Sequence, residues 1–204
     1  MDLSKIIFDN FFNVTKDDIN LKNINEVDYE ILGNDYLYNL KRFEQGNKII
    51  TDKAPLNFRW VGFLKLMLPD CKIIHCNRNK NDNFLSLYIN AFESDMSWVY
   101  SEDNIKLYYT LYQDLMNFWQ EKMPNFIYDC NYENLIENTE TKVKDMLKFC
   151  DLEWDENCLN FEKNKKPIYT ASINQVRKGI YKTSKDKWKK YEDLFPNLFN
   201  VSKI

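Results

Sequence analysis

Glycine, proline and histidine are scarce in this chain of 204 residues, which has four glycines, five prolines and one histidine. So few glycines and prolines imply few sharp turns, and a hydrophobic fraction of 44% with 16% aromatic residues is too high for a disordered chain. The chain is long enough to form one domain with a substantial core, and no linker-like stretch divides it. We therefore expect a single globular, helix-rich domain over residues 1–204.

The sequence also lacks the patterns of a metal site, a disulfide framework and a membrane segment. It contains no C-x-x-C pair, and because His75 is its one histidine, no metal site is expected. The five cysteines are expected to be reduced core residues, and His75 to be a buried, hydrogen-bonded residue rather than a catalytic one. No apolar run approaches membrane length, and the first residues, MDLSKIIFDNFF, do not resemble a signal peptide. These features favour a cytoplasmic protein with no membrane partner.

Positive charge is concentrated near the end of the chain. The segment from Lys163 to Lys190 has ten lysines or arginines and one acid, so a net charge of −3 for the whole chain leaves −12 on the remainder. A uniformly basic surface would suggest nucleic acid, whereas a basic segment on an acidic protein favours a compact polyanion such as a nucleotide. We therefore expect no nucleic-acid partner. A solvated, lysine-rich face remains the alternative.

Helical and strand patterns alternate along the chain. Apolar residues recur at helical spacing in five segments. The helices are expected at residues 28–43, 55–68, 81–92, 103–123 and 139–150. Short apolar runs predict strands at residues 47–51, 71–77 and 125–133. Because strands alternate with helices, the sheet should be parallel and the fold α/β.

Arg78 and Ser86 flank the start of the helix that follows the second predicted strand. The arginine lies at the carboxyl end of the strand and the serine inside the first helical turns. Carboxyl ends of strands in open α/β sheets are where phosphate-bearing ligands bind, and a guanidinium with a hydroxyl suits a phosphate monoester. A surface arginine and an ordinary helical serine would show the same pattern. This pair alone therefore does not distinguish a phosphate site from two unrelated residues.

Four segments, in this order, resemble the sulfotransferase family that uses 3'-phosphoadenosine 5'-phosphosulfate. The similarity covers roughly residues 28–191 and is greatest to the bacterial branch that is often fused to tetratricopeptide repeats and is related to tyrosylprotein sulfotransferases. The segments are TDKAPLNFRWVGFLKLMLPDCKIIHCNRNKNDNFLSLY, YYTLYQDLMNFW, YDCNYENLIEN and TASINQVRKGIYKTSKDKWKKY. Four segments in family order with matching spacing make the resemblance specific.

The resemblance implies a P-loop-hydrolase-like, three-layer α/β fold with a parallel sheet and a site for the nucleotide. Arg78 and Ser86 match the residues that hold the 3'-phosphate, and Arg177, Lys178 and Gly179 resemble the late basic motif that closes over it. A phosphate dianion met by these groups would gain several charge-assisted hydrogen bonds, each worth roughly 1.5 to 3 kcal/mol.

Three further residues match family positions near the nucleotide and the reacting group. Tyr132 resembles the tyrosine that packs near the adenine, and Ser172 matches a position near the nucleotide. Lys53 falls where related enzymes place a residue beside the sulfuryl group, whose developing charge an ammonium would stabilise. The implied reaction moves a sulfuryl group to an acceptor hydroxyl, releases 3',5'-bisphosphoadenosine and needs no metal.

The phosphosulfate-binding loop of the family, a string of the type P-R-S-G-T-T, does not occur in these 204 residues. The resemblance begins after the point where this loop and the following acidic residue would lie, so the first β-loop-α unit is expected to be missing. The chain would then be a fragment, one half of a split enzyme that a complementary N-terminal chain completes, or a remnant that binds nucleotide without catalysis. A helix-rich interaction protein with a basic tail is the alternative from another class.

Overall fold

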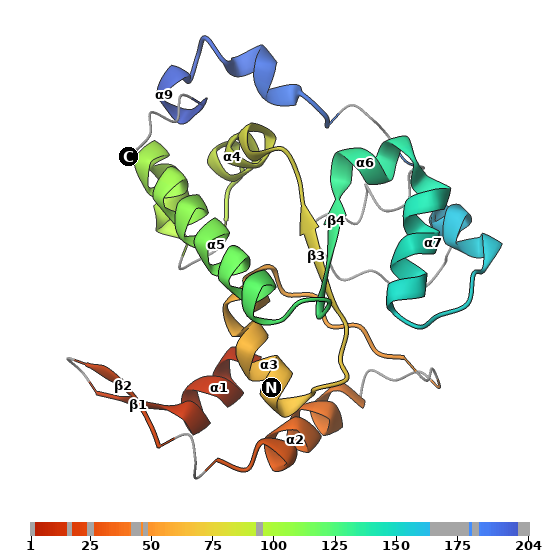
Figure 1. Ribbon diagram of the computed structural model, residues 1–204. Helices are drawn as coiled ribbons and strands as arrows, with labels where there is room; N and C mark the ends of the chain where they lie inside the picture. The colour runs from red at the N-terminus through yellow and green to blue at the C-terminus, as the bar shows by residue number, and fades with distance from the viewer. Residues whose placement is uncertain are drawn as a thin grey trace. The chain divides into compact units, whose positions relative to one another are not determined.

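The computed structural model describes residues 3–15, 18–23, 27–41, 46, 49–92, 96–163, 180 and 184–199. The chain divides into two compact units (Figure 1). The first unit comprises residues 1–73 and 115–124, and the second comprises residues 74–114 and 125–204. Helix α5 (Glu102–Lys122) begins in the second unit and ends in the first.

The first unit is a helical assembly with a small hairpin. Its elements are α1 (Leu3–Phe11), β1 (Phe12–Val14), β2 (Ile19–Leu21), α2 (Tyr29–Lys41), the 3-10 helix η2 (Pro55–Trp60) and α3 (Val61–Met67). In α1, the buried residues Leu3, Ile6, Ile7 and Phe11 recur at helical spacing and pack with α2 and α3 into one core. Strands β1 and β2 form an antiparallel pair with Phe12 opposite Leu21.

The second unit contains the two strands that carry the candidate site. Its elements are β3 (Ile73–Asn77), α4 (Lys80–Ile89), η3 (Ser97–Tyr100), the start of α5, β4 (Ile127–Asn131), α6 (Tyr132–Glu137), α7 (Thr139–Phe149), η4 (Glu156–Lys163), η5 (Lys187–Tyr191) and α9 (Pro196–Phe199). Its main core cluster joins α4, α5 and α9 through Phe84, Leu85, Ile105, Leu198 and Phe199. Much of this core therefore comes from a segment more than 100 residues after α4.

Strands β3 and β4 are neighbours in one sheet and run in the same direction, as Figure 1 shows. Side-chain contacts give their register: His75 contacts Asp129, and Asn77 contacts Asn131. Both strands therefore end at the same edge of the sheet, and α4 and α6 both begin there. The predicted α/β class with a parallel sheet is confirmed.

One predicted strand is wrong for the residues that the structure describes. Ile49 to Thr51 have no strand partner, and Ile49 is 54% exposed. The segment is instead followed by an anchored loop, because the carboxylate of Asp52 accepts hydrogen bonds from the hydroxyl of Tyr36 at 2.6 Å and from the amide of Asn57 at 3.2 Å. A short apolar run without a neighbouring strand gains no ladder of hydrogen bonds.

Candidate functional site

The turn between β3 and α4 is built by an asparagine. The side chain of Asn79 accepts hydrogen bonds from the backbone N–H groups of Asn81 at 3.0 Å and Asp82 at 3.2 Å, which caps the first turn of α4. Arg78 therefore lies between the carboxyl end of β3 and the start of α4, where the sequence predicts it.

Arg78 contacts two segments that are distant in sequence. Its Nη2 donates to the carbonyl of Ser184 at 3.1 Å, and its guanidinium lies 5.5 Å from the centre of the Tyr132 ring. The Nε of Arg78 is buried and has no hydrogen-bond partner among the described residues. A buried donor without a partner costs free energy, so the guanidinium has capacity for an anionic ligand.

Tyr132 is held beside Arg78 by polar contacts between the two strand ends. The amide of Asn131 donates to Asn77 at 3.2 Å and to Glu133 at 3.0 Å, and the backbone N–H of Asn79 donates to the other oxygen of Glu133 at 3.0 Å. Both oxygens of Glu133 are therefore engaged in joining the starts of α4 and α6. This arrangement makes Glu133 a positioning residue for the turn that carries Arg78.

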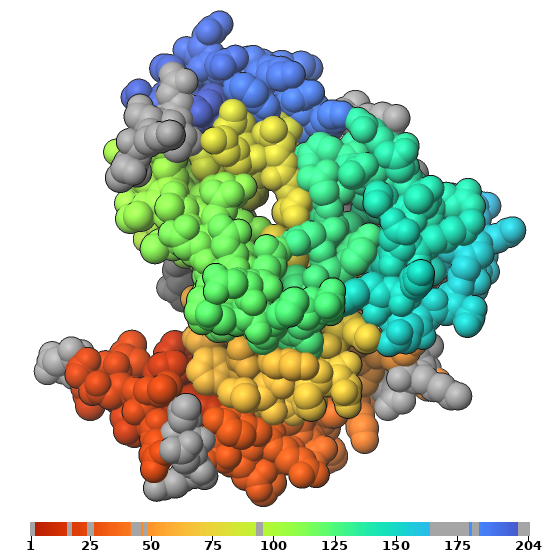
Figure 2. All heavy atoms as spheres, in the orientation of Figure 1, coloured from red at the N-terminus to blue at the C-terminus, as the bar shows by residue number. Residues whose placement is uncertain are grey.

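Asp82 is a buried carboxylate, 2% exposed, that joins α4 to the end of the chain. It accepts hydrogen bonds from the backbone N–H groups of Asp186 at 2.8 Å and Trp188 at 2.9 Å, and it lies 3.9 Å from Nη2 of Arg78. Figure 2 shows the segment of residues 184–199 packed directly on α4. Asp82 therefore fixes the segment whose Ser184 carbonyl contacts Arg78.

Sequence reasoning missed the role of Asp82. An acidic residue in the first turn of a helix is ordinary, because it complements the helix dipole. The backbone groups that it binds follow it by 104 and 106 residues, so no local pattern reveals them.

Ser86 lies on α4 one turn beyond Asp82, on the same face of the helix. Its hydroxyl is 3.4 Å from the amide nitrogen of Asn90, whose stronger contact is with the Ser86 carbonyl at 2.6 Å. The described contacts pair Ser86 with its own helix and not with Arg78.

His75 links the sheet to α5, and its side chain is 13% exposed. Its Nδ1 lies 2.5 Å from a carboxylate oxygen of Asp129, and its Nε2 contacts the hydroxyl of Tyr112. Burial, with smaller contributions from Tyr109, Asp129 and Cys76, raises the pKa of Tyr112 to about 12, so this hydroxyl keeps its proton at neutral pH. The expected hydrogen bonding of His75 is confirmed, but the residue is only partly buried.

The remaining predicted site residues belong to the other unit or lie outside the described residues. Lys53 belongs to the first unit and is exposed, one residue after the anchored Asp52. Ser172, Arg177, Lys178 and Gly179 lie outside the described residues. The structure thus brings Arg78 and Tyr132 into contact and places Ser86 on the adjoining helix.

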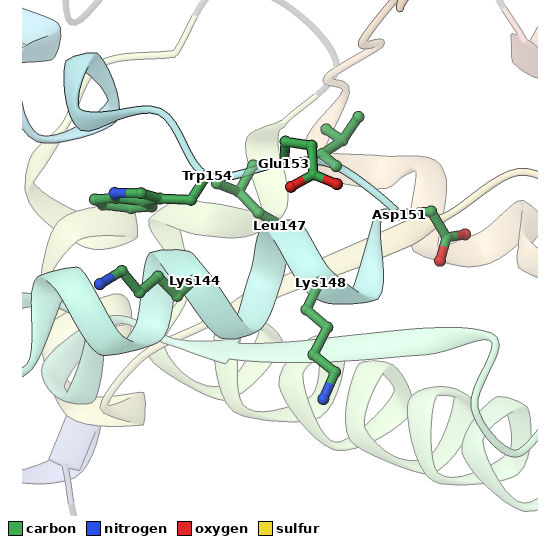
Figure 3. A pocket seen from close by; sticks show the side chains of 7 residues that line it. Lys144, Leu147, Lys148, Asp151, Glu153 and Trp154 are labelled. Atoms are coloured by element: carbon green, nitrogen blue, oxygen red, sulfur yellow. The ribbon is translucent and has the colours of Figure 1, made fainter.

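A shallow pocket of about 510 Å³ lies elsewhere in the second unit, at the end of α7. Its lining residues are Lys144, Leu147, Lys148, Asp151, Leu152, Glu153 and Trp154. Lys144 lies 4.8 Å from the centre of the Trp154 ring, whereas Lys148 and Asp151 point away from it (Figure 3). The charged groups do not converge, and Lys53, Arg78, Ser86 and Tyr132, the predicted site residues that the structure describes, do not line this pocket.

Within the described ranges, no group of three His, Cys, Asp or Glu side chains is placed to hold a metal ion. None of the helices in those ranges has both the length and the apolar composition needed to cross a membrane.

These features define an α/β protein with a candidate anion site at the carboxyl edge of a parallel sheet. A family model described as the sulfotransferase family matches residues 13–156. An uncharacterized protein of Aquifex aeolicus is 36% identical over 175 residues, which cover 81% of this chain and 22% of that protein. The chain belongs to the sulfotransferase family, and it spans about a fifth of the length of this relative.

Proposed function

We propose that the chain binds the 3'-phosphorylated adenine nucleotide of sulfuryl transfer at the carboxyl ends of β3 and β4. The observation that carries this proposal is the contact of Arg78 with the Tyr132 ring, together with the buried Nε of Arg78, which has no partner in the part of the chain that the structure describes. Ligands of open α/β sheets bind outside the carboxyl ends of the strands. A guanidinium stacked on a tyrosine offers donors for a phosphate beside a flat surface for a base.

The nucleotide in this proposal is 3'-phosphoadenosine 5'-phosphosulfate, or its product 3',5'-bisphosphoadenosine. Arg78 would bind the 3'-phosphate, with Ser86 of α4 as a second donor, and Tyr132 would pack near the adenine. The family motif adds Ser172 near the nucleotide, and Arg177, Lys178 and Gly179 at the same phosphate. The basic segment that contains these three residues supports an anionic ligand.

The reaction in this proposal is transfer of the sulfuryl group from the nucleotide to an acceptor hydroxyl of unknown class. Lys53 would stabilise charge that develops on the transferring group. Neither Glu133 nor Asp52 is proposed as the base, because the carboxylate of each already accepts hydrogen bonds that fix a turn or loop. We propose no metal in the reaction, and we propose that the protein acts in the cytoplasm.

Calorimetric titration tests the nucleotide site. We expect the chain to bind 3',5'-bisphosphoadenosine more tightly than 5'-AMP, which lacks the 3'-phosphate. Arg78→Ala should weaken the binding of bisphosphoadenosine by roughly 30- to 150-fold, the equivalent of about 2 to 3 kcal/mol. Arg78→Lys should cause a smaller loss, because it keeps the charge but not the planar fork.

Arg59→Ala is the matched control. The guanidinium of Arg59 also lies over an aromatic ring, 5.3 Å from the centre of Trp60, but in the first unit. Its loss should leave the affinity unchanged. Equal affinity for the two nucleotides, or an unaffected Arg78→Ala variant, would overturn the proposed site.

A further inference from the structure

Cys76 and Cys130 lie side by side on neighbouring strands. The contacts of His75 with Asp129 and of Asn77 with Asn131 both join residues 54 positions apart, so the same register places Cys130 beside Cys76. Their side chains point to the opposite face of the sheet, since side chains alternate along a strand. Neighbouring strands are about 4.8 Å apart, which is within the range of Cα separations that a disulfide spans.

The two thiols differ in exposure and in acidity. Cys76 is exposed, whereas Cys130 is 8% exposed. A hydrogen bond with Cys130 lowers the pKa of Cys76 to about 6 and outweighs the opposing effect of the partial desolvation of its sulfur by neighbouring atoms. The same hydrogen bond, together with burial, raises the pKa of Cys130, although Lys142 of α7 opposes this rise. The lowered pKa of Cys76 favours its thiolate form, which accepts a hydrogen bond from the Cys130 thiol.

We propose that Cys76 and Cys130 form an oxidisable dithiol, in which Cys76 reacts with hydroperoxides and Cys130 resolves the product as a disulfide. The Cys76 thiolate attacks one peroxide oxygen, the O–O bond breaks, and the second oxygen leaves and takes up a proton. The product is a sulfenic acid on Cys76. The Cys130 sulfur then displaces the hydroxyl group, its proton leaves with that group as water, and the S–S bond forms. Two electrons pass from the two thiols to the peroxide.

The exposure of Cys76 and the burial of Cys130 assign these two roles. An attacking thiol must be reached by the oxidant and must be ionised, whereas a resolving thiol needs only to adjoin it. Each cysteine lies two residues before a residue that we place at the nucleotide, Arg78 or Tyr132. The dithiol itself does not depend on nucleotide binding, so its test is independent of the proposed function.

The expected rate advantage of Cys76 is largest in mildly acidic solution. At pH 6, a thiol of pKa about 6 is half ionised, about 150-fold more than a thiol of pKa about 8.5. The lower basicity of its thiolate reduces intrinsic reactivity by roughly tenfold. Cys76 should therefore react with peroxide about tenfold faster than an ordinary exposed cysteine at this pH.

Peptide mapping after mild peroxide treatment at pH 6 tests the dithiol in the full chain. We expect a Cys76–Cys130 linked peptide to be the first disulfide formed, and a reducing agent to reverse it. In Cys130→Ser, the sulfenic acid on Cys76 should persist and be trapped by dimedone. In Cys76→Ser, the oxidation of Cys130 should be about tenfold slower or more.

Cys71→Ser is the control variant. Burial is the main cause that raises the pKa of Cys71, and this residue belongs to the other unit. Its replacement by serine should therefore leave formation of the Cys76–Cys130 linked peptide unchanged. A first disulfide between any other pair would overturn the proposal. Oxidation of Cys76 at the same rate as Cys158, with no Cys76–Cys130 link, would also overturn it.

Discussion

Asp82 shows how one buried residue can hold a distant segment in place. Its carboxylate binds the backbone N–H groups of Asp186 and Trp188. We predict that Asp82→Asn lowers the free energy of unfolding by roughly 2 to 3 kcal/mol, because the amide that replaces one oxygen leaves a backbone N–H facing another donor. A lower urea midpoint with an unchanged slope would show this loss.

Asp103→Asn is the control for Asp82. The Asp103 carboxylate is 90% exposed and pairs with Lys106 at 2.8 Å, so its loss should change the stability by less than about 0.5 kcal/mol. If both variants unfold at the same urea concentration, Asp82 does not hold the C-terminal segment.

The acidity of Cys76 gives a second prediction at the scale of single residues. Because the pKa of this thiol is lowered to about 6, its reaction with iodoacetamide should be half-maximal near pH 6 and constant above about pH 8. An ordinary cysteine reaches half its maximal rate near pH 8.5. Cys130→Ala removes the hydrogen bond and should move the Cys76 profile toward higher pH. Alkylation rates measured by mass spectrometry would contradict the assignment if Cys76 and Cys158 follow the same profile.

At the scale of elements, the packing of α2 on α3 depends on a glycine. A Cβ atom at Gly33 would lie 2.2 Å from the carbonyl oxygen of Met67, a backbone atom that cannot move without the helix. We predict that Gly33→Ala lowers the free energy of unfolding by roughly 1 to 3 kcal/mol, although alanine favours a helix by about 1 kcal/mol.

Asn34→Ala, at an exposed position of the same helix, is the control for Gly33. It should be neutral or slightly stabilising, because alanine has the higher helix propensity and no contact is lost in the core. Urea unfolding of both variants measures the difference. A Gly33→Ala variant as stable as Asn34→Ala would contradict the close approach of α2 and α3.

The elements that the sequence predicted well are those with strong local periodicity. Helix α5 lies within one residue of the predicted bounds at each end, and β3 begins two residues later than predicted. The strand expected at residues 47–51 failed because its pattern was only a pair of isoleucines, and strand formation depends on a neighbour that the pattern does not contain. The short hairpin of β1 and β2 was not predicted, because its formation also depends on strand pairing that the sequence pattern does not contain.

The candidate site was predictable only in part, because some of its contacts join residues that are close in sequence and others join residues that are far apart. The position of Arg78 between a strand and a helix follows from local patterns. Its contacts with Tyr132 and Ser184 depend on strand pairing and on the fold of the C-terminal segment. No periodicity encodes such pairings.

At the scale of the whole molecule, the proposed site residues are divided between the two units. Lys53 belongs to the first, and Arg78, Ser86 and Tyr132 belong to the second. The sequence contains no glycine-containing loop of the P-R-S-G-T-T type. Since each donor to the reacting group contributes about 10² to 10³ in rate, we predict that these 204 residues bind bisphosphoadenosine but transfer no sulfuryl group alone.

Addition of a family-type strand-loop-helix, fused or as a separate chain, should restore transfer from the sulfated nucleotide. In that complete protein, Lys53→Ala should abolish transfer and leave the affinity for bisphosphoadenosine within about threefold, because the product lacks the sulfuryl group. Transfer by the 204 residues alone would show that another segment supplies those donors. Binding without transfer, even in the completed protein, would favour a non-catalytic nucleotide-binding module.

Hydrogen exchange with and without 3',5'-bisphosphoadenosine tests the location of the nucleotide most directly. We predict slower exchange in peptides that cover residues 77–86 and 131–137, where α4 and α6 begin, and unchanged exchange in peptides that cover the α7 pocket at residues 144–154. The Arg78→Ala variant should lose this protection at the same nucleotide concentration. Protection confined to residues 144–154, or no protection at residues 77–86 under saturating nucleotide, would contradict a nucleotide site at the carboxyl ends of β3 and β4.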